Sequence, residues 1–204
     1  MNTDKRPGTL LFNPFVYIAG GKALVLGLLA ILVAGFLGSL STTHFDGVLD
    51  THTGRAASLW LFLAEGIIAW LCSGIVLLIF GRIISTTSFR SIDLLGTQAL
   101  ARWPTIFSAL VCFPPGVRRF GNQLIEQIKR GGEFQINVAD AIVFAVVLIA
   151  ILIFTCWMVA LMYKSFSISC NVKGGKAIGS FIVGVLIAEI LSVICIWSLA
   201  KYTL

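Results

Sequence analysis

Charged residues, histidines and paired cysteines are scarce in this sequence. Each shortage argues against a particular class of protein or site. Only 12% of the 204 residues are charged, whereas a soluble globular domain carries about 25%. The five cysteines form no CxxC pair, so we interpret them as small packing residues rather than disulfide or metal ligands. No GxSxG, Walker, dinucleotide or HExxH motif is present, and the sequence therefore predicts neither an enzyme nor a bound cofactor.

Long apolar runs are what the sequence has in abundance. Hydrophobic residues make up 58% of the chain, and its mean hydropathy is +0.98. Five stretches approach or exceed the ~20 residues that one bilayer crossing needs. They are Ala23–Thr43, Ala56–Gly81, Leu94–Val117, Ala141–Tyr163 and Ala177–Ala200. We predict an all-α integral membrane protein, a five-transmembrane-helix bundle, with residues 1–22 as a polar or interfacial leader and 23–204 as one membrane domain.

The third stretch differs from the other four because it carries Arg102 and Pro104 in its first half. A cation in hydrocarbon needs a partner or water, and a proline inside a helix removes a hydrogen bond and kinks it. The sequence thus predicts a proline-kinked third helix around which the cleaner spans pack.

Lysine and arginine in the connecting segments predict the orientation. With the N-terminus inside, the inner segments hold eight of these residues and the outer segments hold six. This favours an inside N-terminus and an outside C-terminus. The net charge of +6 is scattered between apolar spans, so we assign it to contacts with anionic lipid and predict no nucleic-acid partner.

Asp93-Leu94-Leu95-Gly96, followed by Pro104, resembles the DLxG motif and downstream proline of the Yip family of Ypt/Rab-GTPase-interacting membrane proteins. The five-span layout and the short tail after the last span are similar too. The resemblance implies a compact bacterial-type member in the inner (plasma) membrane. We do not carry over small-GTPase binding, because Thr97 replaces the proline usual in eukaryotic members and the chain lacks their long N-terminal region.

The loop between the first two spans holds both histidines of the chain and two aspartates within nine residues. The four candidate ligands are His44, Asp46, Asp50 and His52. Imidazole and carboxylate suit zinc or a similar divalent ion, although their spacing matches no recognised metal motif. The alternative is a solvated loop in which Asp46-Gly47 forms a turn.

Glu65, Arg102 and Glu189 form a second candidate site, because helix rise places them within ~6 Å of one depth in the membrane. We expect Arg102 to pair with one glutamate. Such a cluster could be purely structural, or it could relay protons or ions; a third possibility is that Arg102 reaches the inner surface without contacting either carboxylate.

Two classes of function remain. The first is a non-enzymatic membrane protein that assembles with itself or another membrane protein and affects membrane organisation or trafficking. Small residues on spans one and five support it, because they allow close helix contact; they are Gly27, Gly35, Gly38, Gly179 and Gly184. The second is a small transporter or channel that uses the Glu65, Arg102 and Glu189 cluster, and a remote third is metal binding by the 44–52 loop.

Overall fold

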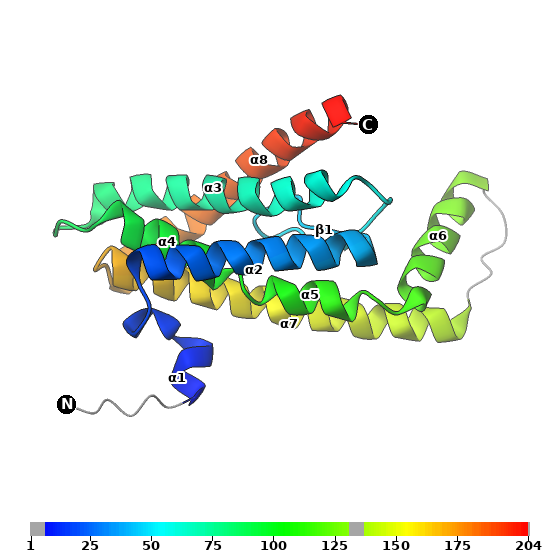
Figure 1. Cartoon of the computed structure of the whole chain (residues 1–204), viewed down its shortest axis with the longest axis horizontal. Coiled ribbons are helices and arrows are strands. Elements are labelled where there is room, and N and C mark those ends of the chain that lie inside the picture. The colour runs from blue at the N-terminus through cyan, green and yellow to red at the C-terminus, as the bar shows by residue number, and fades with distance from the viewer. Residues whose placement is uncertain (1–6, 131–136, 204) are drawn as a thin grey trace.

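The computed structural model describes residues 7–130 and 137–203, and most of them are helical (Figure 1). The remaining parts of the expected leader and of the expected membrane domain lie outside the described residues. The elements in chain order are α1 (Pro7–Phe12), the 3-10 turn η1 (Pro14–Val16), α2 (Gly20–Ser41), β1 (Thr43–His44), β2 (His52–Thr53), α3 (Leu59–Ile84), α4 (Ser91–Ala101), α5 (Thr105–Val111), α6 (Pro115–Arg130), α7 (Val138–Ser169) and α8 (Gly174–Thr203).

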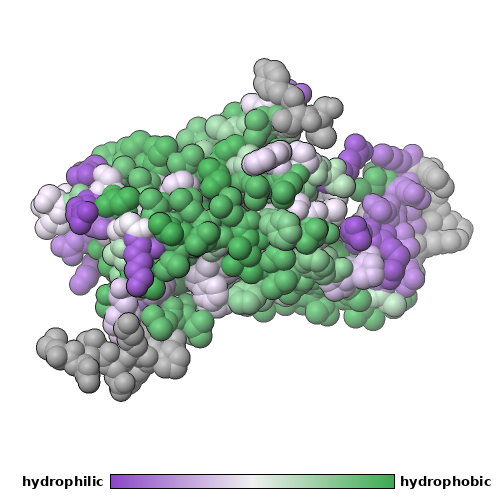
Figure 2. Space-filling view, in the orientation of Figure 1, coloured by the Kyte–Doolittle hydropathy of each residue, from purple (hydrophilic) through white to green (hydrophobic). Residues whose placement is uncertain are grey.

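Helices α2, α3, α7 and α8 are each long and apolar enough to cross a bilayer. They have between 22 and 32 residues, and a helix rises ~1.5 Å per residue against a hydrocarbon core of ~30 Å. Figure 2 shows the consequence at the surface, where hydrophobic residues form a broad band and hydrophilic residues gather at the two ends. The expectation of an all-α membrane-embedded protein is confirmed.

The third apolar stretch forms two short helices rather than one kinked helix. Helix α4 ends at Ala101 and α5 begins at Thr105. The amide of Trp103 donates to the Leu100 carbonyl, three residues back rather than four. Pro104 has no amide to continue the helix. The hydroxyl of Thr105 donates to the Arg102 carbonyl at 2.7 Å. The proline therefore ends α4, and the carbonyls freed at this break find other donors.

Glycines in α2 allow the close packing of this part of the bundle. A Cβ at Gly27 would collide with the backbone of Leu100 and Ala99 in α4, and one at Gly35 would lie 2.9 Å from the Phe62 carbonyl oxygen in α3. The small-residue face of the first span is thus used inside the chain. In α8, Gly184 packs against Leu77 of α3, whereas Gly179 has no atom near its Cβ position.

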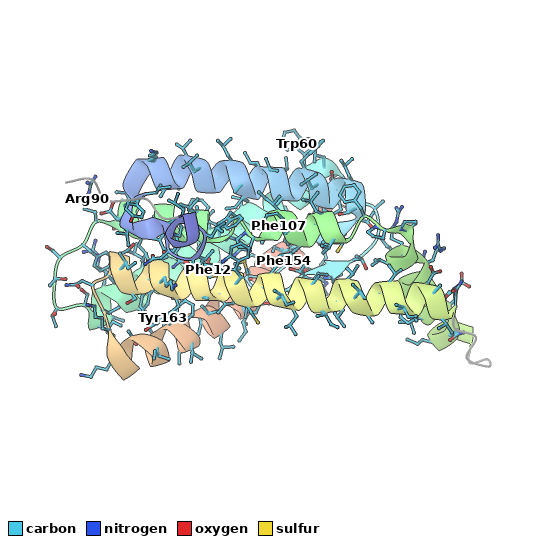
Figure 3. All side chains as sticks on the ribbon, turned by 90° about the horizontal axis from the view of Figure 1, so that it is seen from below. Phe12, Trp60, Arg90, Phe107, Phe154 and Tyr163 are labelled. Atoms are coloured by element: carbon cyan, nitrogen blue, oxygen red, sulfur yellow. The ribbon has the colours of Figure 1, made fainter. Side chains whose placement is uncertain are left out.

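Helix α7 packs along α5 and receives the N-terminal segment. Figure 3 shows Phe107 of α5 and Phe154 of α7 close together, and their rings stack with centroids 5.4 Å apart. Lys164 donates to the Phe12 carbonyl at 2.8 Å, and the ring of Phe12 lies 5.7 Å from that of Trp157. The N-terminal helix α1 is therefore tied to the flank of the bundle.

Gly27→Ala should destabilise the protein, because the added methyl group meets backbone atoms that cannot rotate away. Overpacking of this kind costs roughly 1–3 kcal/mol, and the melting temperature in detergent should fall. Gly21→Ala is the matched control, since it lies in the same helix with open space at its Cβ position. Equal melting temperatures for Gly27→Ala and the wild type would contradict the close contact between α2 and α4.

Candidate functional site

The 42–58 loop between α2 and α3 does not extend into solvent but folds back against the bundle. Strands β1 and β2 pair antiparallel, with Thr43 opposite Thr53 and His44 opposite His52. Phe45 and Val48, between the strands, are only 3% and 1% exposed. Phe45 packs with apolar residues of α2 and α5, and Val48 joins the main core. Burial of these two side chains anchors the loop among the helices.

Glu65 of α3 binds the first half of this loop. Its Oε1 lies 2.8 Å from His44 Nδ1, and its Oε2 accepts a hydrogen bond from the Phe45 amide at 3.1 Å. Glu65 is 2% exposed. A carboxylate in such a site needs hydrogen-bond donors or a positive charge, and the loop supplies both kinds of partner.

His44 is positioned to carry that positive charge. Its second ring nitrogen, Nε2, lies 2.9 Å from the Arg55 carbonyl oxygen, so both ring nitrogens face oxygen atoms. A carbonyl and an ionised carboxylate only accept hydrogen bonds, and a histidine that donates from both nitrogens is protonated. Burial lowers the pKa of His44, but the hydrogen bonds to Glu65 and to the Arg55 carbonyl outweigh it and leave this pKa above its usual value. The geometry favours a His44–Glu65 ion pair.

Glu189 of α8 binds the second half of the loop. Its Oε2 accepts the Leu49 amide at 2.8 Å. Its Oε1 contacts Gly47 so closely that a Cβ at that position would collide with it. The two glutamates, for which helix rise predicts a similar depth, therefore both hold the backbone of the same loop, one from α3 and one from α8.

Arg102 is 2% exposed and lies where α4 ends. The expected pair between it and a glutamate does not form: the ion pairs among the described residues join His44 to Glu65, His52 to Asp46 and Asp50, and Arg119 to Asp140. Arg102 Nη1 has no hydrogen-bond partner in the described part of the chain. Both carboxylates bind the loop instead.

Asp46, Asp50 and His52 come together at the exposed edge of the loop. One ligand atom from each lies within 4.8 Å of the others, and His52 Nδ1 is 3.2 Å from Asp46 Oδ1. That contact raises the pKa of His52 above its usual value. His44 stacks on the His52 ring with centroids 5.6 Å apart, but its two nitrogens are engaged elsewhere. Three of the four candidate metal ligands therefore form one cluster, and the fourth does not join it.

A cavity of about 510 Å³ opens beside these groups. The loop and the beginning of α3 supply its polar lining, and α8 supplies an apolar wall. Its lining includes His44, Asp46, His52, Glu65, Val193, Ile196 and Trp197. A ligand in this cavity would meet titratable groups on one side and hydrocarbon on the other.

The Asp93–Gly96 motif and Pro104 lie away from this cavity and serve packing. Gly96 lets α4 contact the beginning of α2, since a Cβ there would collide with the Gly20 carbonyl and would lie 2.9 Å from the Leu24 amide. Leu94 is fully buried, and the Asp93 carbonyl accepts the Thr97 hydroxyl at 2.7 Å. The motif thus fixes α4 against α2, and Pro104 ends α4.

Glu189→Ala should expose the second half of the loop, because the Leu49 amide loses an acceptor that carries charge. Such hydrogen bonds contribute ~1.5–3 kcal/mol, so amide exchange at Leu49 should accelerate roughly tenfold or more. Hydrogen exchange with mass spectrometry measures it. Glu189→Gln keeps an acceptor oxygen and should keep most of the protection, and Glu126→Ala, an exposed carboxylate of α6, should leave it unchanged. Wild-type exchange in Glu189→Ala would contradict this role.

We compared the chain with protein-family models, with curated proteins and with solved structures, and none of the three comparisons gave a match. The function proposed below therefore rests on the residues and their geometry.

Proposed function

We propose that the chain is a non-enzymatic multi-pass membrane protein that acts through assembly in the bilayer, as its Yip-like sequence pattern implies. One observation carries the choice between assembly and ion transport. Both carboxylates bind the 42–58 loop: Glu65 through both of its oxygens, and Glu189 through Oε2, which accepts the Leu49 amide. A relay group must exchange its partner during transport, whereas these two hold a folded loop in place.

We further propose that α4 and α5 together make a fifth crossing. They follow one another in the same direction along the bundle in Figure 1. Non-helical backbone at membrane depth is tolerated where protein surrounds it, and Arg102 at the break is buried. Five crossings place the 42–58 loop, α6 and the C-terminus on one side. With the N-terminus inside, that side is the outer face of a bacterial inner membrane.

The partner in this proposal is another membrane protein or a second copy of the chain. The cavity beside the loop and the apolar residues of α8 around it supply the contact. Trp197 lines this cavity and is 64% exposed, and large aromatic side chains in such positions often dominate binding energy. A photo-crosslinker at residue 197 should therefore trap a specific partner in native membranes, whereas one at Val146 of α7, which is also exposed, should trap none.

The proposal also predicts that the protein conducts nothing. Purified protein in liposomes should pass protons, cations and anions no faster than empty vesicles do. Flux that Glu189→Gln abolishes, together with no partner trapped at residue 197, would overturn the assembly proposal and establish the transporter.

Divalent-metal binding is a second candidate, favoured by the approach of Asp46, Asp50 and His52 to within 4.8 Å of one another. Carboxylate oxygens and a histidine nitrogen are suitable ligands for zinc or manganese. Protein purified in the presence of each metal should retain about one equivalent, and His52→Ala should lose it. Glu126→Gln removes an exposed carboxylate elsewhere and should retain the metal. No retained metal in the wild type would remove this candidate.

A further inference from the structure

A second cavity, of about 550 Å³, lies between α6 and the 42–58 loop. It borders the first cavity, because residues 54–56 line both. Neither the carboxylate site nor the proposed assembly uses it. Three cations line it, Arg55 from the loop and Arg118 and Lys129 from α6, against one carboxylate, Glu126. The cavity is therefore electropositive.

The three cations are available to a ligand. All three side chains are exposed, and none takes part in the ion pairs found in the described ranges. The neighbouring Arg119 differs, because it makes two hydrogen bonds to the buried Asp140 of α7, at 2.7 and 2.9 Å. That pair holds α6 against α7, and it thereby fixes the positions of Arg118 and Lys129 on the same helix.

Thr42 supplies a second and independent observation. It lines the same cavity and is only 7% exposed, yet its hydroxyl has no hydrogen-bond partner among the described residues. The hydroxyls of Ser41 and Thr43 on either side bind each other at 2.8 Å. Thr42 also ends α2 in a left-handed conformation, with φ of 55° and its amide donating to the Gly38 carbonyl. The conformation is explained by the end of the helix, whereas a buried, unpartnered hydroxyl in a cavity wall is a feature that a ligand can explain.

The ligand that fits is a phosphate group, since guanidinium, ammonium and hydroxyl groups all donate to its oxygens. Its position favours a lipid over a free ion. Helix α6 is strongly amphipathic, with Ile128 81% exposed and Ile125, which lines the cavity, 53% exposed. A helix of this kind lies at the boundary between headgroups and acyl chains. Figure 2 shows hydrophilic residues gathered at this end beside the hydrophobic band.

We propose that this cavity binds the headgroup phosphate of an anionic phospholipid, with Arg55, Arg118, Lys129 and the Thr42 hydroxyl as donors. The acyl chains lie against Ile125 and the apolar side of α6. Glu126 disfavours a headgroup with a second negative group and can accept a hydrogen bond from a headgroup hydroxyl. The class of ligand is therefore a phosphodiester lipid with a neutral, hydroxyl-bearing headgroup.

Native mass spectrometry of the full chain in detergent tests this proposal with phosphatidylglycerol and phosphatidylcholine as probes. Phosphatidylglycerol should stay bound at lower concentration than phosphatidylcholine, and the double variant Arg118→Ala/Lys129→Ala should lose its affinity by roughly tenfold or more. Thr42→Val keeps the shape of the side chain and removes only the hydroxyl; it should weaken binding severalfold. Lys173→Ala, an exposed lysine in the turn before α8, should bind as the wild type does.

Three results would overturn the proposal. Equal retention of the two lipids would remove the preference for an anionic headgroup. Equal losses in Lys173→Ala and in the double variant would reduce the effect to general surface charge. Displacement of phosphatidylglycerol by an equal concentration of inorganic phosphate would assign the site to free phosphate rather than to lipid. If Thr42→Val fails to fold, the double variant and its control decide the outcome.

Discussion

The structure depends on the need to satisfy two carboxylates that the sequence places inside apolar helices. Glu65 and Glu189 have no lysine or arginine within ion-pair distance among the described residues, and a charge left unpaired in such a site is costly. The 42–58 loop supplies what they need, which is one histidine and two backbone amides. In return the carboxylates fix a segment that has little regular structure of its own.

This arrangement decides where the functional surfaces form. Because the loop is held inward from α3 and α8, its two sides face two cavities. One is lined by titratable groups and the apolar wall of α8, and the other by the cations of α6. Residues 54–56 separate them, and Arg55 takes part in both: its carbonyl accepts from His44, and its side chain lines the basic cavity.

The irregular third stretch follows from a second constraint. Pro104 cannot continue a helix, so α4 ends early. A tightened turn satisfies the Leu100 carbonyl, and Thr105 donates to the Arg102 carbonyl at the break, where Arg102 is buried. Glycines in α2 allow α4 to approach closely enough to bury this break. The sequence suggested that small residues on the first and fifth spans bind a partner. Most of them, including Gly27, Gly35 and Gly184, instead pack against other helices of the same chain.

The sequence by itself determined the membrane class, the positions of the four long helices and the presence of an interruption near Pro104, because hydropathy, length and proline geometry are local properties. It also singled out Glu65, Glu189 and the 44–52 loop as candidates, since glutamates in apolar helices and clustered histidines are rare enough to stand out, but it did not point to the amides of Phe45 and Leu49. Only the tertiary structure decided their partners. His44 lies 21 residues from Glu65, and Leu49 lies 140 residues from Glu189; no local pattern encodes such contacts. Depth along a helix axis suggested that Arg102 would pair with a glutamate, but depth carries no information about a loop that folds back between helices.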